Sequence, residues 1–534
     1  MRNGRLSKDI GLTSLIMSGM TCMIGSGWLF GAYKATKIAG PAALVSWIIG
    51  GIAILFIALT YAELSALFPR VGGMVRYLEY THGSFAGFTA GWANWLAIVT
   101  VIPVESTASV QYMASWPWAW AQALYNMQNQ ELSPWGLFAA SLLLIFYFLM
   151  NYWSVKLFLR FMVSMALIKI FVPLLTFASL FFASFHPNNF HFPGQGFAPF
   201  GITGILTAVS TSGIVFAFHG FQSIINLAGE TKRPGKNIPI AIISAIFSTL
   251  IIYLLLQATF ISAMPTHLVQ LGWDQIRFDS PFAELAIAFN LNFLVLSLYF
   301  DAFISPSGTA STYMATTSRM LYGMTQNGYM PKFMGILNPT YHIARGALWI
   351  NLIISFIFLW VFKGWSYLVP IVSLMGVISY MAGPISTVAL RHLGSHFHRP
   401  IKIPFLNILA PMSFIIISLI LYWGRWPLTG EVILLVLAGY IIYAYYQYKK
   451  SWSNLKKQFK SGVWILFYLL TIALLSFIGS NKFGGINLLN YSWSMIFIVI
   501  SSLAYYYWGI KTAWETPFIK KMTRHERLFY SRKK

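Results

Sequence analysis

The stretch MIGSGWLFGAYK, residues 23–34, interrupts a membrane-length apolar segment that extends from residue 10 to about residue 37. An unbroken spanning helix pairs its own backbone polar groups, whereas Gly25, Ser26 and Gly27 would free N–H and C=O groups where hydrocarbon cannot bond them. Broken helices are tolerated where they line a cavity, and in secondary transporters the exposed half-helix N-terminus binds an anionic group of the substrate. The break therefore favours small-molecule transport.

The composition predicts an all-α polytopic membrane protein. The 534 residues are 57% hydrophobic and only 9% charged, with a mean hydropathy of +0.66, which exceeds what one soluble core needs. Scanning for stretches of about 20 apolar residues, enough to span the hydrocarbon, gives roughly fourteen segments. Their centres lie near residues 22, 54, 98, 145, 171, 215, 250, 302, 352, 379, 414, 439, 471 and 500.

The net charge of +23 is distributed by loop, which indicates a lipid bilayer as the partner and not nucleic acid. If the N-terminus is cytoplasmic, most Lys and Arg residues, including the leader, Arg70 and the C-terminal tail, fall on that side. The other side receives only Lys34, Lys37, Arg277, Lys363, Arg425 and Lys482. The positive-inside rule then predicts a multi-pass protein of the cell (inner) membrane with both termini in the cytoplasm.

A second break is predicted in the sixth segment, STSGIVFAFHGFQSIINLAGE over residues 210–230, which carries Gly213, His219 and Gly220. The two breaks lie five segments apart, an odd number, so a second copy of the unit would be inverted relative to the first. This is the order of 5+5 inverted-repeat transporters. The last four segments show no such break. We therefore expect a core of about ten helices over residues 1–400 and peripheral helices with a basic cytoplasmic tail over residues 401–534.

Four motifs resemble the amino acid–polyamine–organocation superfamily. They are IGSGWLFGAYKATKIAGPAALVSW (24–47), YAELSALFPRVGGMVRYLEY (61–80), FAFHGFQSIINLAGETKRPGKNIPIAI (216–242) and SRMLYGMTQNGYMPKFMGILNP (318–339). The resemblance implies a LeuT-type core with the substrate site between helices one, three, six, eight and ten. GSGWLFG together with GWANWLAIVTVIPVESTASVQY (91–112) is similar to the aspartate–proton symporter group. A count of about fourteen helices departs from the twelve common in the superfamily.

The first break is a candidate anion site. The amides of Ser26, Gly27 and Trp28 open the outer half-helix, so their N–H groups and the positive end of the dipole would face a carboxylate. Met23 and Gly25 complete the candidate substrate contacts at this break. The alternative is a packing seam, because Gly27-xxx-Gly31 is also a helix-contact pattern.

The second break is a candidate site for the amino group of a substrate. Carbonyls released between Gly213 and Phe216 would accept hydrogen bonds from an ammonium, and Phe218 or Phe221 would close over the ligand. An α-amino acid fits both breaks. His219 either reads the substrate side chain or exchanges a proton, or else simply satisfies a local hydrogen bond.

Lys169, in the middle of the fifth segment, is a candidate coupling residue because burial disfavours its charged form. The alternative is a structural ion pair with Asp301. By resemblance, Lys169 matches the helix-five lysine that takes the place of a sodium ion in proton-coupled members. Its ammonium would then bond helix-one carbonyls and helix-eight hydroxyls, for which Ser305 and Ser307 are candidates.

Two acids complete the predicted proton-coupling set. Asp301 in the eighth segment and Glu105 in the third would relay protons or pair with a cation, since an unpaired carboxylate at that depth is costly. For Glu105, a place at the outer end of its helix is the alternative.

The sequence thus predicts a secondary active transporter: a proton-coupled amino acid symporter working by alternating access, with aspartate favoured through the resemblance. An exchanger or antiporter of the same fold, or a non-transporting amino acid sensor or channel, remains open, as does the oligomeric state. No HExxH, GxSxG or paired Cys/His spacing is present, so neither an enzyme nor a metal or cofactor site is expected.

Overall fold

The computed structural model describes residues 10–69, 73–153, 155–191, 194, 196–339, 341, 343–448 and 455–531. The leader (1–9), Arg70 and the last three residues, which contribute to the topology prediction, lie outside the described residues. Within the described part, the chain consists of helices joined by turns and loops, with one hairpin of β1 (Tyr125–Asn126) and β2 (Glu131–Leu132) and an isolated parallel bridge between Ile10 and Thr231.

Eleven helical stretches among the described residues are long and apolar enough to cross a membrane. They are α2 (Ser26–Ala39) continuing into α3 (Ala43–Leu67), α5 (Ser84–Met113), α7 (Pro134–Trp153), α12 (Pro234–Ser262), α15 (Asn292–Gln326), α16 (Arg345–Phe362), α17 (Trp365–Tyr380) continuing into α18 (Ala382–Leu393), α19 (Leu406–Trp423), α20 (Leu428–Tyr448), α21 (Leu455–Ile478) and α22 (Tyr491–Thr512). Shorter apolar helices are α1 (Leu12–Met23), the latter part of α8 (Val155–Ala183), and α9 (Gly201–Thr211) with α10 (Ile214–Ala217). Every predicted segment centre lies within a helix, which confirms the all-α polytopic membrane class.

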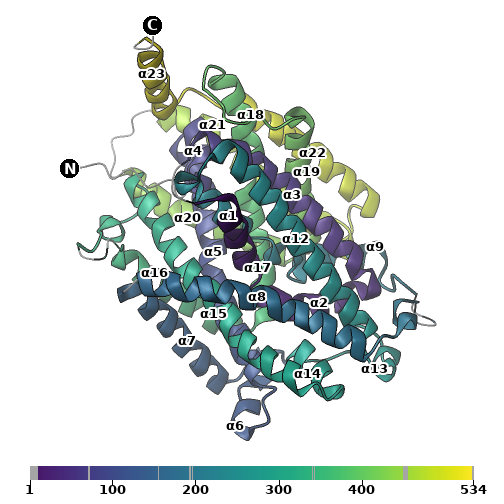
Figure 1. Cartoon of the computed structure of the whole chain (residues 1–534). Helices are drawn as coiled ribbons and strands as arrows, with labels where there is room; N and C mark the ends of the chain where they lie inside the picture. Colours follow the sequence, from purple (N-terminus) through teal and green to yellow (C-terminus); the bar gives the residue numbers. More distant parts are fainter. Residues whose placement is uncertain are drawn as a thin grey trace.

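Short helices connect or flank these elements. They are α4 (Tyr77–His82), α6 (Ala119–Gln122), α11 (Phe221–Asn226), α13 (Thr266–Gln270), α14 (Pro281–Ala288) and α23 (Pro517–Ser531), with 3-10 turns at Gly40–Ala42, Gly73–Val75, Pro187–His191, Ala228–Glu230, Lys332–Gly335 and Asn481–Phe483. Figure 1 shows α23 at the end of the bundle that also holds α4.

The first predicted break is present. α1 ends at Met23 and α2 begins at Ser26, because Ile24 and Gly25 adopt non-helical backbone angles. α1 lies within the bundle against α8, α11, α12 and α15 (Figure 1). The interruption is therefore surrounded by protein, which is the setting in which non-helical backbone is tolerated at membrane depth.

The segment that contains the second predicted break, residues 201–226, is interrupted twice. Ser212 and Gly213 separate α9 from α10, and Gly213 has a φ of +98°, a left-handed conformation that favours glycine. A second interruption separates α10 from α11 at Phe218–Gly220. α10 packs on α2 and α17, and α11 packs on α1, so the two broken segments lie side by side.

A proline helps to join the helices around the breaks. Pro306 inside α15 has no N–H, so the Ala302 carbonyl one turn earlier loses its helical donor. The Ser109 hydroxyl on α5 donates to that carbonyl at 2.9 Å. α5 and α15 are thereby hydrogen-bonded within the bundle.

Candidate functional site

The two breaks touch through their glycines. A Cβ added to Gly220 would lie 2.3 Å from the Met23 backbone nitrogen, and one added to Gly27 would lie 3.2 Å from the Ala217 Cβ. A Cβ on Gly25 would lie 2.7 Å from the Glu105 Oε1. A side chain at Gly220 would therefore require the Met23 backbone to move, and at Gly27 the contact between the breaks is tighter than most side chains make.

The N-terminal end of α2 is bound by a carboxylate from inside the protein. The Ser26 amide donates to the Glu105 Oε2 at 2.8 Å, so the positive end of this half-helix has an anionic partner, as its dipole favours. Glu105 is 0% exposed, which excludes the alternative of a solvated place at its helix end. The Trp365 indole donates to the Ser26 hydroxyl at 2.9 Å and fixes the same residue from α17.

The C-terminal end of α1 is bound by an ammonium. Lys169, on α8 and also 0% exposed, donates to the Thr21 carbonyl at 2.9 Å and to the Thr309 hydroxyl at 2.7 Å. A cation at a helix C-terminus complements the dipole. These bonds join α8 to α1 and to α15.

The α15 hydroxyl at Lys169 is a correction to the sequence analysis. It belongs to Thr309 and to neither Ser305 nor Ser307. Asp301, Ser305 and Thr309 follow one another at intervals of four and share one face of α15. Ser307 points elsewhere, and its hydroxyl lies 3.1 Å from the Tyr147 hydroxyl.

Asp301 accepts from the Trp28 indole at 3.2 Å through Oδ2. Among the described residues the salt bridges join Glu63 to Arg391 at 2.6 Å and to Arg399 at 3.6 Å, so the structure holds no Lys169–Asp301 salt bridge. The Oε1 of Glu105 and the Oδ1 of Asp301 are buried without a hydrogen-bond partner in the described part of the chain. Both acids thus keep free acceptor capacity close to the first break.

The second break is lined by rings. Phe216 lies 6.3 Å from the His219 ring and 6.4 Å from Trp365, whereas Phe218 packs on Trp47 and Tyr253, and Phe221 on Tyr380. The carbonyls of Gly213, Val215 and Phe216 accept from amides three or four residues later.

His219 is buried against α17, where a Cβ added to Gly376 would lie 2.4 Å from its Cε1. Neither ring nitrogen of His219 has a hydrogen-bond partner among the described residues. The alternative of a histidine satisfied by a local hydrogen bond is therefore absent from this structure.

Sequence reasoning missed three residues of the site. They are Trp365, Thr309 and Tyr253. The Tyr253 hydroxyl donates at 2.9 Å to the Met23 carbonyl, which also accepts from the Gly25 amide. The spacing of eight residues from Asp301, two steps of four through Ser305, could have identified Thr309. Nothing local distinguishes Trp365 or Tyr253 from other aromatic residues of an apolar span. Within the described residues, no cluster of three His, Cys, Asp or Glu side chains could hold a metal ion.

Two broken helices lie side by side inside the bundle, and the first of them binds both a carboxylate and an ammonium, an arrangement that is typical of membrane carriers. A sequence model of the amino acid permease family matches residues 10–501. The chain belongs to this family, and so to the amino acid–polyamine–organocation superfamily, and is a transporter rather than an enzyme.

Two relatives from Bacillus subtilis (strain 168) match nearly the whole chain. The glutamate/serine transporter AimA is 53% identical over 517 residues, 97% of this chain and 96% of that protein. The aspartate-proton symporter is 37% identical over 516 residues, 95% of this chain and 97% of that protein. A methylthioribose transporter of the same organism is 25% identical over 84% of this chain and 95% of that protein.

Proposed function

We propose that this chain is a proton-coupled amino acid symporter that takes aspartate or glutamate as its substrate. It works by alternating access about a LeuT-type 5+5 core over residues 1–400, with broken helices one and six. Residues 401–534 add about four peripheral helices, for about fourteen spans in all. The protein lies in the cell (inner) membrane with both termini in the cytoplasm.

The observation that carries this proposal is that two side chains of opposite charge bind the first break. A carboxylate, Glu105, holds the amide end of α2, and an ammonium, Lys169, holds the carbonyl end of α1. The backbone of this break therefore accommodates an anion and a cation at once. An amino acid carries the same two charges, and proton transfer changes either protein group.

Glu105 gives a physical link between proton and substrate. While ionised, its carboxylate makes a charge-assisted bond to the Ser26 amide, the same amide that a substrate carboxylate needs. A proton on Glu105 weakens that bond and releases the amide. The substrate carboxylate then takes the amide end of α2, so that one proton and one substrate enter together.

Lys169 links protonation to the movement of α1. Its ammonium bonds Thr21 on α1 and Thr309 on α15, and both bonds are stronger while the lysine is charged. Loss of its proton loosens α1 from α8 and α15. Reorientation of α1 toward the cytoplasm follows that release.

The substrate class rests on two supports. The first is the similarity to a glutamate/serine transporter and to an aspartate-proton symporter. The second is His219, a buried side chain beside the second break with both ring nitrogens free among the described residues. A substrate carboxylate on the side chain needs such a donor in a low-dielectric site.

Uptake of labelled aspartate, glutamate and serine into proteoliposomes tests the proposal. We expect accumulation under an inward proton gradient and none under a sodium gradient alone. Glu105→Gln, which keeps the size of the side chain, should lose at least tenfold of the gradient-driven uptake while counterflow exchange continues. Glu131→Gln, on the half-buried β2 strand, is the matched control.

Three results would contradict parts of the proposal. Strict sodium dependence would remove the proton as the coupling ion. Exchange without any net accumulation would make the protein an antiporter. A charged hydrogen bond is worth about 1.5–3 kcal/mol. Competition by the α-carboxamide of aspartate as strong as by aspartate would therefore show that the N-terminal end of α2 does not receive a carboxylate.

A further inference from the structure

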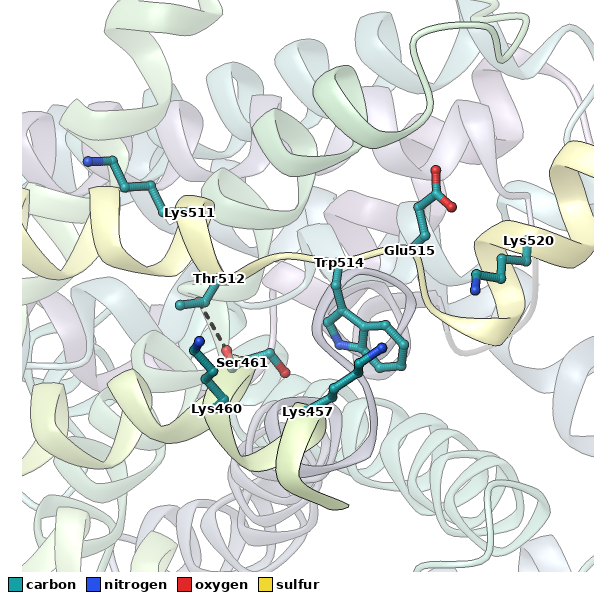
Figure 2. A pocket seen from close by; sticks show the side chains of 8 residues that line it. All are labelled: Lys457, Lys460, Ser461, Lys511, Thr512, Trp514, Glu515 and Lys520. Atoms are coloured by element: carbon teal, nitrogen blue, oxygen red, sulfur yellow. Dashed lines mark hydrogen bonds between the residues drawn. The ribbon is translucent and has the colours of Figure 1, made fainter. Parts of the chain in front are cut away.

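A lysine-rich pocket of about 380 Å³ lies between α21, α22 and the segment that leads into α23. Figure 2 shows lysines from α21, α22 and α23 around it, with Trp514 in the connecting segment and the Lys511 side chain directed away from the others. The lining residues are Lys457, Lys460, Ser461, Lys511, Thr512, Trp514, Glu515 and Lys520. The carrier site uses none of them.

The charges around this pocket are unbalanced. Four lysines face one carboxylate, Glu515, and all five side chains are exposed. Lys457 and Lys460 also lie in the first two turns of α21, where the positive end of the helix dipole disfavours cations. Among the described residues that line the pocket, Glu515 is the one carboxylate beside these four lysines, and a bound anion would relieve their repulsion.

The lipid-facing side of α21 leads to the pocket. Phe459, Phe467, Leu470 and Leu474 are all exposed, and their spacing places them on one side of the helix. Phe459 directly precedes Lys460. An acyl chain that follows this apolar stripe would therefore bring its headgroup to the lysines.

Aromatic residues place the pocket at headgroup depth. Tyr507 and Trp508 on α22 are exposed one turn before Lys511, and Trp508 stacks on Phe467 of α21. Tyrosine and tryptophan gather at the membrane–water interface because their rings are apolar and their edges polar. The pocket thus begins where the hydrocarbon ends.

The floor of the pocket is held by hydrogen bonds. The Thr512 hydroxyl donates to the Ser461 carbonyl at 3.2 Å, the dashed line in Figure 2. Trp514 donates through its amide to the Thr81 carbonyl at 3.0 Å and through its indole to the His82 carbonyl at 3.2 Å. These bonds attach the α22–α23 segment to α21 and to the last turn of α4, so the pocket is formed without a ligand.

We propose that this pocket binds a phosphate group, and that the group is the headgroup of an anionic phospholipid. Lys457, Lys460 and Lys520 contact the phosphate oxygens, and the acyl chains lie along α21. The Glu515 carboxylate accepts from a hydroxylated headgroup such as glycerol. The side of the membrane follows from the topology in the proposed function, but the site itself does not depend on transport.

Lipid binding to purified protein in neutral detergent tests this site. Thermal shift and native mass spectrometry should show preference for phosphatidylglycerol over phosphatidylcholine. Each Lys→Gln change at Lys457, Lys460 or Lys520 should weaken binding about fivefold, since a lysine near an anionic surface contributes about 1 kcal/mol. The triple change Lys232→Gln, Lys236→Gln and Lys332→Gln, at exposed lysines elsewhere, is the charge-matched control and should bind as the wild type does.

Inorganic phosphate and glycerol phosphate form the second arm. A shift with phosphatidylglycerol but not with these soluble anions supports the lipid as the source. An equal shift with the soluble anions, lost in the pocket variants, supports the phosphate site and overturns the lipid assignment. Equal lipid binding by the control triple variant and by a pocket triple variant, Lys457→Gln, Lys460→Gln and Lys520→Gln together, would overturn the site. Raising the salt from 0.1 to 1 M should abolish the shift in either arm, which tests the site without any substitution.

Discussion

The two broken segments of this transporter satisfy their freed backbone groups in different ways. At the first break, ionisable side chains bind both helix ends: Glu105 the amide of Ser26, and Lys169 the carbonyl of Thr21. At the second break, turn-like backbone bonds satisfy the carbonyls, and aromatic rings surround the chain. The first break is thus bound by charged side chains, whereas the second is surrounded by apolar rings.

This difference suggests a division of work between the breaks. Groups that change charge on proton binding belong to coupling, because their bonds to backbone strengthen or weaken with the proton. Rings, and a histidine that has no hydrogen-bond partner among the described residues, belong to recognition, because they present fixed surfaces and one polar contact. Changes at the first break should therefore alter the driving force, and changes at the second should alter selectivity.

The largest effect is expected from Lys169→Met. Methionine fills similar volume without donating, so the Thr21 carbonyl and the Thr309 hydroxyl lose their buried donor. We expect proton-driven accumulation to fall by about a hundredfold or more, which corresponds to about 3 kcal/mol for breaking a buried charged interaction. Uptake and counterflow in proteoliposomes would measure it, with Lys332→Met at an exposed position as the control. Accumulation at the wild-type level would reduce Lys169 to a structural role.

A smaller effect is expected from Gly27→Val. The new Cβ would lie 3.2 Å from the Ala217 Cβ and 3.5 Å from a Phe216 ring carbon, and its methyl groups would crowd the contact between the breaks. We expect a stability loss of about 1–3 kcal/mol from overpacking and a larger loss in substrate affinity. Thermal unfolding and ligand binding measure the two separately, and Gly11→Val, with open space around it, is the control. Parallel losses in both would favour the packing-seam interpretation of Gly27.

The fold was accessible from the sequence because hydrophobic length and glycine position are local signals. Gly25 and Gly213 marked both interruptions, and the apolar segments located the helices. The sequence predicts one break in the sixth segment, whereas the structure has two, at residues 212–213 and at residues 218–220. The two are not distinguished in the sequence because Gly213 and Gly220 lie in the same apolar run. Family membership followed from the same motifs.

The site was only partly accessible. Lys169, Glu105 and Asp301 stood out because charges are rare at membrane depth. Their partners did not, since the Thr309 hydroxyl and the Trp365 indole come from helices far away in sequence, and their contacts depend on how each helix is rotated. Ser307 was chosen by residue type alone and lies on the wrong face of α15.

At the second break, His219→Gln should change selectivity more than rate. Glutamine fits a similar space and still donates, but it cannot carry a proton charge. We expect the preference for aspartate and glutamate over neutral amino acids to fall by about tenfold, because a hydrogen bond from a charged donor is worth about 1.4 kcal/mol more than one from a neutral amide. Competition assays at several pH values would measure it. An unchanged preference would show that His219 does not take part in recognition. Loss of proton coupling would show that it acts in coupling, together with Glu105 and Lys169.

The smallest effect is expected at a carboxylate outside the membrane-length helices. Glu284, on α14, accepts at 2.7 and 2.9 Å from the amides of Asp279 and Ser280 just before that helix, and Glu105 accepts from the amide of Ser26, the first residue of α2. Burial raises the pKa of Glu284 from 4.5 to about 7. The folded state therefore binds more protons than the unfolded state between these two pKa values. The contribution of Glu284 to the free energy of unfolding is fully present below about pH 4.5 and is lost as the pH rises through 7.

Glu284→Gln should remove this dependence, because glutamine does not titrate yet still accepts from the two amides. We expect the fall in Tm between pH 5 and pH 8 to be smaller in the variant than in the wild type by about 2 °C, with transport and its proton dependence unchanged. Thermal unfolding in detergent at the two pH values measures the first, and proteoliposome uptake the second. Loss of proton coupling in this variant would show that a carboxylate on a helix N-terminus couples wherever it lies in the molecule. The position of Glu105 at the first break would then no longer explain its role in proton coupling, because that position is what distinguishes it from Glu284.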